Sequence, residues 1–183
     1  MPQIIKNRTV IDDDWLVVRA AEDGGLPPPD ALPAGKIIVP FSYWQASREA
    51  LTGARAKSQI AVWLAPDSEP EAIVADFDAV ALIAIDFPVF RDGRGYSIAR
   101  LLRERYGYTG EIRAIGDVLH DQLLYMSRCG FDAFAVRQDK DIHDALRAFG
   151  ELTIHYQTGT DQKLPLFRRR EAANASKAPG AQA

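Results

Sequence analysis

The residues best suited to chemistry lie together between positions 85 and 97. An apolar run ends at Asp86, and a loop with two arginines and two glycines follows before a helical segment begins. Glycine lets a backbone approach a ligand, N–H groups at the start of a helix favour an anion, and arginine binds an oxyanion through two hydrogen bonds. The loop therefore predicts a site for sulfite, sulfate or phosphate. Gly116, in the turn after the next predicted strand, is expected to contribute to the same site. The predicted anion-binding residues are Arg91, Asp92, Gly93, Arg94, Gly95, Ser97 and Gly116.

A structural interpretation of the same loop stays open. Asp92-Gly93 is a common turn pair, and Asp86 can serve only to accept a hydrogen bond from an arginine or to cap a turn. The loop also differs from two known phosphate-binding motifs. It has neither the Gly-x-x-x-x-Gly-Lys-Ser/Thr pattern of the P-loop nor the Gly-x-Gly-x-x-Gly pattern of dinucleotide-binding folds.

A second group of titratable residues follows the next predicted strand. Asp117 and His120 are three positions apart, so they are neighbours on a helix. Asp86, Asp117 and His120 are candidate catalytic residues, with either aspartate as the general base and His120 as the acid. The sequence favours a structural alternative, because acidic residues at the start of a helix cap it and interact favourably with its dipole. These residues do not make a metal site by themselves, and no metal is predicted.

The elements that must position these residues alternate along the chain from residue 36 onward. Five apolar stretches are predicted as strands, at 36–40, 59–64, 79–85, 112–115 and 131–136. Helical patterns follow them at 42–51, 69–77, 97–106, 118–128 and 139–149, and a further strand at 152–157 stays open. Asp117 is expected to cap the fourth helix, and Asp139 is expected to open the last one. Strands that alternate with helices pair in parallel, so their carboxyl ends share one edge of the sheet.

The predicted fold class is α/β, with about five βα units in a parallel sheet and a short N-terminal β hairpin. Two closures stay open: an open doubly wound sheet, which the pattern favours, and a partial β/α-barrel, since a full barrel needs eight strands. One domain is expected over residues 1–160, with an N-terminal β unit at 1–18 and a Pro/Gly loop at 22–35. Residues 164–183 lose the apolar period and are expected to form a flexible C-terminal tail.

Composition limits the classes of function. The chain has 183 residues, 47% of them hydrophobic, which suits one soluble domain, and its net charge of −3 argues against a general nucleic-acid binder. Cys129 is the only cysteine, so neither an intrachain disulfide nor a four-thiolate iron–sulfur cluster can form. No apolar run approaches the ~20 residues of a membrane helix, and the first residues show no signal pattern. We therefore expect a cytoplasmic protein with no nucleic-acid or membrane partner.

Residues 79–136 resemble an uncharacterised bacterial family. The resemblance is carried by Ile85–Ser97 (IDFPVFRDGRGYS), Arg100–Arg103 (RLLR) and Arg113–Gln122 (RAIGDVLHDQ). These motifs are similar to those of the domain of unknown function 934, whose members are often labelled oxidoreductases involved in sulfite reduction. The similarity runs from the N-terminus to about residue 157 and leaves out the tail. The family has no established catalytic residues that could be transferred to this chain.

The resemblance implies a role in sulfate assimilation and leaves two hypotheses. The first is an accessory protein of assimilatory sulfite reduction, which binds a small oxyanion or docks on a sulfite reductase subunit. The alternative is an oxidoreductase or other small-anion enzyme that uses the aspartates and the histidine named above. An oxidoreductase needs an electron carrier, and no cofactor motif is evident in this sequence. A flavin stays open, because its phosphate can bind at helix N-termini without a recognisable motif.

Overall fold

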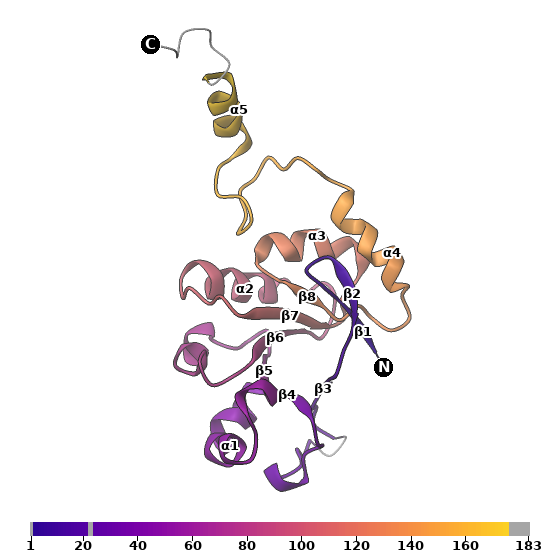
Figure 1. Cartoon of the computed structure of the whole chain (residues 1–183), viewed down its shortest axis with the longest axis vertical. Helices are drawn as coiled ribbons and strands as arrows, with labels where there is room; N and C mark the ends of the chain where they lie inside the picture. Colours follow the sequence, from indigo (N-terminus) through magenta and orange to yellow (C-terminus); the bar gives the residue numbers. More distant parts are fainter. Residues whose placement is uncertain (1, 22–23, 176–183) are drawn as a thin grey trace.

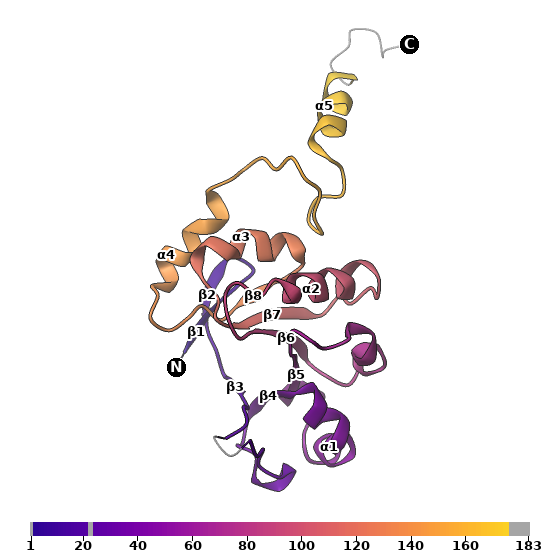
Figure 2. The ribbon, with the colours of Figure 1, turned by 180° about the vertical axis from the view of Figure 1, so that it is seen from behind.

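The computed structural model describes residues 2–21 and 24–175 (Figure 1 and Figure 2). Eight strands form one sheet in the order β2-β1-β8-β7-β6-β5-β4-β3, which confirms the α/β class. The strands are β1 (Gln3–Lys6), β2 (Thr9–Asp12), β3 (Trp15–Val17), β4 (Lys36–Pro40), β5 (Ile60–Leu64), β6 (Leu82–Phe87), β7 (Glu111–Gly116) and β8 (Ala133–Phe134). The α-helices are α1 (Phe41–Ala54), α2 (Arg94–Glu104), α3 (His120–Cys129), α4 (Ile142–Leu146) and α5 (Leu166–Ala175). Short 3-10 helices are η1 (Pro29–Ala31), η2 (Lys57–Gln59), η3 (Pro70–Asp76) and η4 (Arg147–Gly150).

The six strands from β3 to β8 are parallel and follow one another across the sheet in chain order. Right-handed crossovers that all step in one direction place their helices on the same face of the sheet. A doubly wound sheet needs a point where the strand order reverses. The favoured closure, the open doubly wound sheet, is therefore wrong, and the barrel-like alternative describes this sheet. An apolar run indicates a strand buried on both faces, but not the direction in which its crossover steps.

The predicted N-terminal hairpin is confirmed, and it extends the sheet. β1 pairs antiparallel with β2 on one side and antiparallel with β8 on the other, where Ile5 lies opposite Phe134. The next strand, β3, does not continue the hairpin. It pairs in parallel with β4 at the far end of the sheet. The predicted β unit at 1–18 is thus divided between the two ends of one sheet.

The two outermost strands, β2 and β3, are joined only by Asp13 and Asp14. From Asp12 to Trp15 the chain spans at most about 11 Å, because consecutive Cα atoms lie ~3.8 Å apart. The sheet must therefore curl until its two edges approach each other. Figure 1 shows this curl, with the chain passing directly between β3 and β2. The sheet consequently has an outer face and an inner face.

Helices cover the outer face, and a smaller apolar cluster fills the inner one. The larger core joins outward strand residues to the helices, and it includes Ile37, Val62, Ile83, Trp44 of α1, Ile98 of α2 and Leu123 of α3. The inner cluster consists of Ile38, Ala61, Leu82, Ala84 and Ile115, with Trp15, Val17, Trp63 and Ala135 packed against it. Strand residues alternate between these two cores, as the pleat requires.

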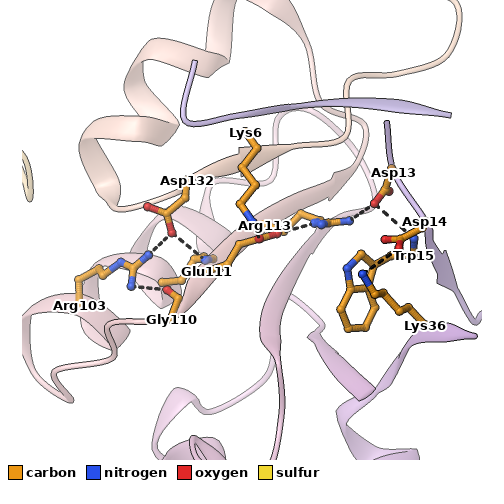
Figure 3. A network of polar contacts seen from close by, with 11 residues as sticks. Lys6, Asp13, Asp14, Trp15, Lys36, Arg103, Gly110, Glu111, Arg113 and Asp132 are labelled. Atoms are coloured by element: carbon orange, nitrogen blue, oxygen red, sulfur yellow. Dashed lines mark hydrogen bonds and ion pairs between the residues drawn. The ribbon is translucent and has the colours of Figure 1, made fainter. Parts of the chain in front are cut away.

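A chain of charged side chains crosses the inner face (Figure 3). Arg113, only 3% exposed, donates from Nε to Glu111 Oε1 at 2.8 Å and from Nη1 to Asp13 Oδ1 at 2.9 Å. Lys6 Nζ lies 2.6 Å from Glu111 Oε2. An isolated buried charge is strongly unfavourable, whereas two cations alternating with two anions neutralise one another. The chain of charges connects β1, β7 and the β2–β3 linker, and so holds the curled edges together.

The region after β8 departs from the prediction. The last helix is capped by Asp141 instead of Asp139, since the Asp141 carboxylate accepts from the backbone N–H of His143 at 2.8 Å. The segment 152–157 forms no strand. Residues 151–175, here called the arm, run as an irregular segment into α5, which projects from the body in Figure 1 and Figure 2. α5 lies within the predicted flexible tail, and residues 176–183 of that tail lie outside the described residues.

Candidate functional site

The loops after β6 and β7 lie side by side at the C-terminal edge of the sheet. β6 and β7 are neighbouring strands, with Phe87 opposite Gly116. Three hydrogen bonds then join their loops: Asp117 N to Phe87 O at 2.7 Å, Phe90 N to Asp117 Oδ2 at 2.9 Å and Gln122 Nε2 to Phe90 O at 2.6 Å. The residues predicted from these two loops are therefore assembled in one region.

Asp86 is buried at the end of β6 and is held by an arginine from the segment that follows β3. Arg19 donates from Nη2 to Asp86 Oδ1 at 2.6 Å and from Nη1 to Oδ2 at 3.2 Å, and its guanidinium lies over the Trp63 ring at 5.4 Å. The hydrogen bond to Asp86 raises the pKa of Arg19. Sequence reasoning missed Arg19, although it stands just after β3. Its position at this edge follows only once β3 is assigned to the parallel sheet.

Asp117 does not cap α3, because the helix begins after Leu119 and the carboxylate is used elsewhere. Asp117 Oδ1 accepts from Arg137 Nη1 at 2.8 Å. Arg137 also donates from Nε and Nη2 to the two oxygens of Asp139, at 2.6 and 3.0 Å. This double hydrogen bond lowers the pKa of Asp139 to about 2. Arg137 follows β8, so its place at the edge was predictable, but its bond to Asp117 was not.

The predicted anion loop contains its own ion pair. Asp92 Oδ1 accepts from Arg94 Nε at 3.0 Å and from the Arg94 backbone N–H at 3.2 Å, and Oδ2 accepts from Nη2 at 2.7 Å. The hydrogen bond from Arg94 lowers the pKa of Asp92. Arg94 nevertheless remains 61% exposed. Arg91 is exposed as well, and no ion pair or hydrogen bond of its side chain is found within residues 2–21 and 24–175.

Two of the predicted ligand glycines are required by packing. A Cβ at Gly95 would lie 2.7 Å from Phe87 Cζ, and a Cβ at Gly116 would lie 2.4 Å from Phe87 O. Gly116 also has a φ of +93°, which side chains rarely adopt. Gly93 has open space around it, and Ser97 is exposed on α2. Close approach of a ligand therefore remains available at Gly93.

His120 contacts acidic residues of the segment after β8. Its Nε2 lies 2.8 Å from Glu151 Oε1, and its Nδ1 lies 3.7 Å from Asp144 Oδ2. The hydrogen bond to Glu151 raises the pKa of His120. The three candidate acid–base residues, Asp86, Asp117 and His120, thus have three separate sets of partners. In the described part of the chain, no group of three or more His, Cys, Asp or Glu residues could hold a metal ion.

A hollow of 480 Å³ opens at the same edge, between β1, the β2–β3 linker and the ends of β7 and β8. Its lining combines polar residues with an apolar wall. The lining residues are Pro2, Gln3, Ile4, Asp13, Gly116, Ala135, Val136, Arg137, Gln138 and Asp139. Concave sites of about 300–1,000 Å³ are typical of small-molecule binding. Sequence reasoning missed this hollow, because β1 and Asp13 reach it only through the closure of the sheet.

Comparison with known proteins identifies one family. The family described as bacterial protein of unknown function (DUF934) matches residues 61–167, which is more than half of the chain and includes most of β5, all of β6 to β8 and the arm as far as Phe167. No curated protein matches the sequence. No helix within residues 2–21 and 24–175 combines the length and apolar character needed to cross a membrane.

Proposed function

The chain belongs to the bacterial family of unknown function DUF934, and from that premise we propose that it is an accessory protein of assimilatory sulfite reduction. In this proposal the β6–α2 loop binds a small oxyanion and the arm docks on a sulfite reductase subunit. The pathway comes from the resemblance described in the sequence analysis. The anion contact and the docking element are argued here from the geometry of the loop and of the arm.

The observation that carries the proposal is the Arg94–Asp92 pair. Asp92 presents two oxygens to Nε and Nη2 of Arg94, in the two-point geometry that a sulfite or sulfate ion would adopt. The carboxylate thus stands where the anion would bind. Arg94 is 61% exposed, although Asp92 is only 13% exposed, so an incoming oxyanion can reach the guanidinium and compete with Asp92 for it.

Two neighbouring features favour an anion at this loop. Arg91, three positions before Arg94, has an exposed side chain and adds a second positive charge. Gly93 has no heavy atom within 4 Å of its Cβ position, so an anion can reach the backbone there. The N-terminus of α2 adds the favourable end of a helix dipole.

Titration of the purified protein with sulfite, sulfate and phosphate by calorimetry tests the anion site. Arg94→Ala and Arg91→Ala should each weaken binding by roughly tenfold or more, the effect of losing a charge-assisted hydrogen bond. Asp92→Asn should strengthen binding, because it removes the competing carboxylate. Arg100→Ala, on the exposed side of α2 and paired with Glu104 at 2.8 Å, is the matched control and should have no effect.

Two outcomes would overturn this half of the proposal. One is the absence of binding for all three anions at millimolar concentration. The other is unchanged affinity in Arg94→Ala at an unchanged melting temperature. In the source bacterium, deletion of the gene should prevent growth on sulfate but not on sulfide, and the Arg94→Ala gene should fail to restore growth on sulfate. Normal growth of the deletion strain on sulfate would contradict the proposed role in assimilatory sulfite reduction.

The arm supports docking, because it exposes large apolar residues that the body does not cover. These are Leu152, Ile154, Tyr156, Leu164 and Phe167, each at least 50% exposed. Exposed apolar surface concentrated in one segment is typical of an interaction site. A chain that ends at residue 150 should fail to co-purify with the reductase subunit. Co-purification that survives this truncation would contradict docking through the arm.

A further inference from the structure

The hollow at the C-terminal edge has two walls of opposite charge. Asp13 forms one wall from the β2–β3 linker, and Arg137 forms the other from the segment after β8. The volume of 480 Å³ is within the range of small-molecule sites. The hollow is also distinct from the Arg94 loop of the proposed function, since none of Arg91, Gly93 and Arg94 lines it.

Asp13 has one carboxylate oxygen available. Its Oδ1 accepts from Arg113 Nη1 at 2.9 Å and from the Trp15 backbone N–H at 3.3 Å. Its Oδ2 has no hydrogen-bond partner within the described ranges 2–21 and 24–175. The side chain is 11% exposed, and Oδ2 is not fully buried, so this oxygen remains accessible to a ligand. A carboxylate oxygen in such a position is best satisfied by a cationic donor such as an ammonium group.

Arg137 on the opposite wall is held by a carboxylate that can leave. Its Nε and Nη2 donate to Asp139, whose side chain is 56% exposed, while Nη1 remains bound to Asp117. Asp139 can turn into solvent, because an exposed ion pair of this kind contributes little. A ligand carboxylate would then occupy the same two donor positions.

We propose that this hollow binds a free α-amino acid, with its ammonium group at Asp13 Oδ2 and its carboxylate at Arg137 in place of Asp139. The remaining wall selects the side chain of the ligand. Ile4, Ala135 and Val136 line it and are apolar, so the preferred amino acid has an apolar side chain.

The charges of the hollow distinguish this ligand from simpler ones. A doubly charged anion would approach Arg137 but would also face the unpaired oxygen of Asp13. A simple amine would satisfy Asp13 and would leave Arg137 with its present partner. A ligand that carries both an ammonium group and a carboxylate uses both walls, and its carboxylate replaces that of Asp139.

The test is calorimetric titration of the full chain with alanine, valine, leucine and methionine. For the tightest ligand, the N-acetyl derivative, which lacks the ammonium group, and the amide, which lacks the carboxylate, should each bind at least about tenfold more weakly. Arg137→Gln should weaken binding of the free amino acid, and Asp139→Asn should strengthen it. Arg147→Gln, on the exposed η4 surface and paired with Asp144, is the matched control and should leave binding unchanged.

These ligand derivatives avoid a variant of Asp13, which would disturb the buried Arg113 pair. Absence of binding for all four amino acids at millimolar concentration would overturn the proposal. If the N-acetyl derivative binds as tightly as the free amino acid, the proposed ammonium contact with Asp13 is wrong. If Arg137→Gln binds the free amino acid as tightly as the parent protein does, the proposed carboxylate contact is wrong. Tighter binding of a dipeptide than of its first amino acid would overturn the assignment to a free amino acid. None of these results depends on sulfite binding at Arg94, so the two sites can fail separately.

Discussion

Three aspartates at the C-terminal edge of the sheet are each paired with an arginine. Asp86, Asp92 and Asp117 are held at 2.6, 2.7 and 2.8 Å by guanidinium groups. A ligand that binds here, as we propose, must therefore replace one partner of a pair. In the proposed anion loop, substituting Asp92 should increase affinity for anions, whereas substituting Arg94 should decrease it. This opposite response separates a binding site from a purely structural ion pair.

Gly95→Ala is expected to lower the melting temperature. The added methyl group would lie 2.7 Å from Phe87 Cζ and 3.1 Å from Ile85 Cγ2, and overfilling a core costs about 1–3 kcal/mol. In a chain of this length, 1 kcal/mol lowers the melting temperature by roughly 2–4 °C. Scanning calorimetry measures the effect. The matched control is Gly93→Ala, which has open space within 4 Å and should melt close to the parent protein. An equal loss in both variants would contradict the packing argument.

At the scale of elements, the arm is attached to the body through polar contacts. Thr160 N donates to Arg128 O at 2.8 Å, and Lys163 Nζ lies 2.7 Å from Glu104 Oε1. The first residue of the arm, Glu151, is held by His120. Because these contacts join α2 and α3 to a segment with an exposed apolar side, the arm can detach locally without unfolding of the sheet.

The attachment at Glu151 should depend on pH. The pKa of His120 is raised in the folded protein by the hydrogen bond to Glu151, with Asp144 adding to the effect. Because the pKa of His120 is higher in the folded than in the unfolded protein, the attachment is fully stabilised at pH values below the unfolded pKa. This stabilisation is lost as the pH rises through the folded pKa. Hydrogen exchange of residues 151–158, corrected for intrinsic rates, should therefore show more opening near pH 8 than near pH 6.

The controls for this prediction are two histidine variants. His120→Gln should abolish the additional opening of residues 151–158 near pH 8. His143→Gln, exposed on α4, should retain the pH dependence of the parent protein. Identical pH profiles in the parent and in His120→Gln would show that another group controls the attachment.

The sequence predicts the elements better than their partners. The four long parallel strands were expected close to their observed bounds, because continuous apolar runs indicate buried strands. The same runs place Asp86 and Asp117 at the C-terminal edge. Arg19 could not be assigned to Asp86, because β3 was interpreted as part of the N-terminal unit. Only pairing between distant strands brings Arg19 there, and local periodicity carries no information about such pairing.

The end of the domain was predicted least well, for a related reason. The apolar stretch 131–136 forms only two strand residues, since β8 pairs with a short β1 on one side. The stretch 152–157 has apolar residues but no neighbouring edge to pair with, because β1 already covers β8. Strand propensity without an open edge therefore gave an irregular, exposed segment.

At the scale of the whole molecule, Arg113 joins parts of the chain that are far apart in sequence. Arg113→Met should lower stability by about 3–5 kcal/mol, because it leaves the carboxylates of Asp13 and Glu111 buried without a cation between them. Urea denaturation measures the loss. The control is Arg100→Met, whose exposed pair with Glu104 contributes little, so its stability should match that of the parent protein. A stable Arg113→Met variant would show that the ion pairs of Arg113 are not needed to hold the sheet closed.

The pairing of Ile5 with Phe134 sets an order of events during biosynthesis. The β1–β2 hairpin leaves the ribosome before β8 does, and an isolated two-stranded hairpin is at best marginally stable in water. Within the described residues its other neighbour in the sheet is β8, so this pairing must wait until residue 134 has emerged. Pairing between such distant segments makes folding slow. A nascent chain stalled before that point should keep both sheet edges unprotected, however many of its helices have already formed.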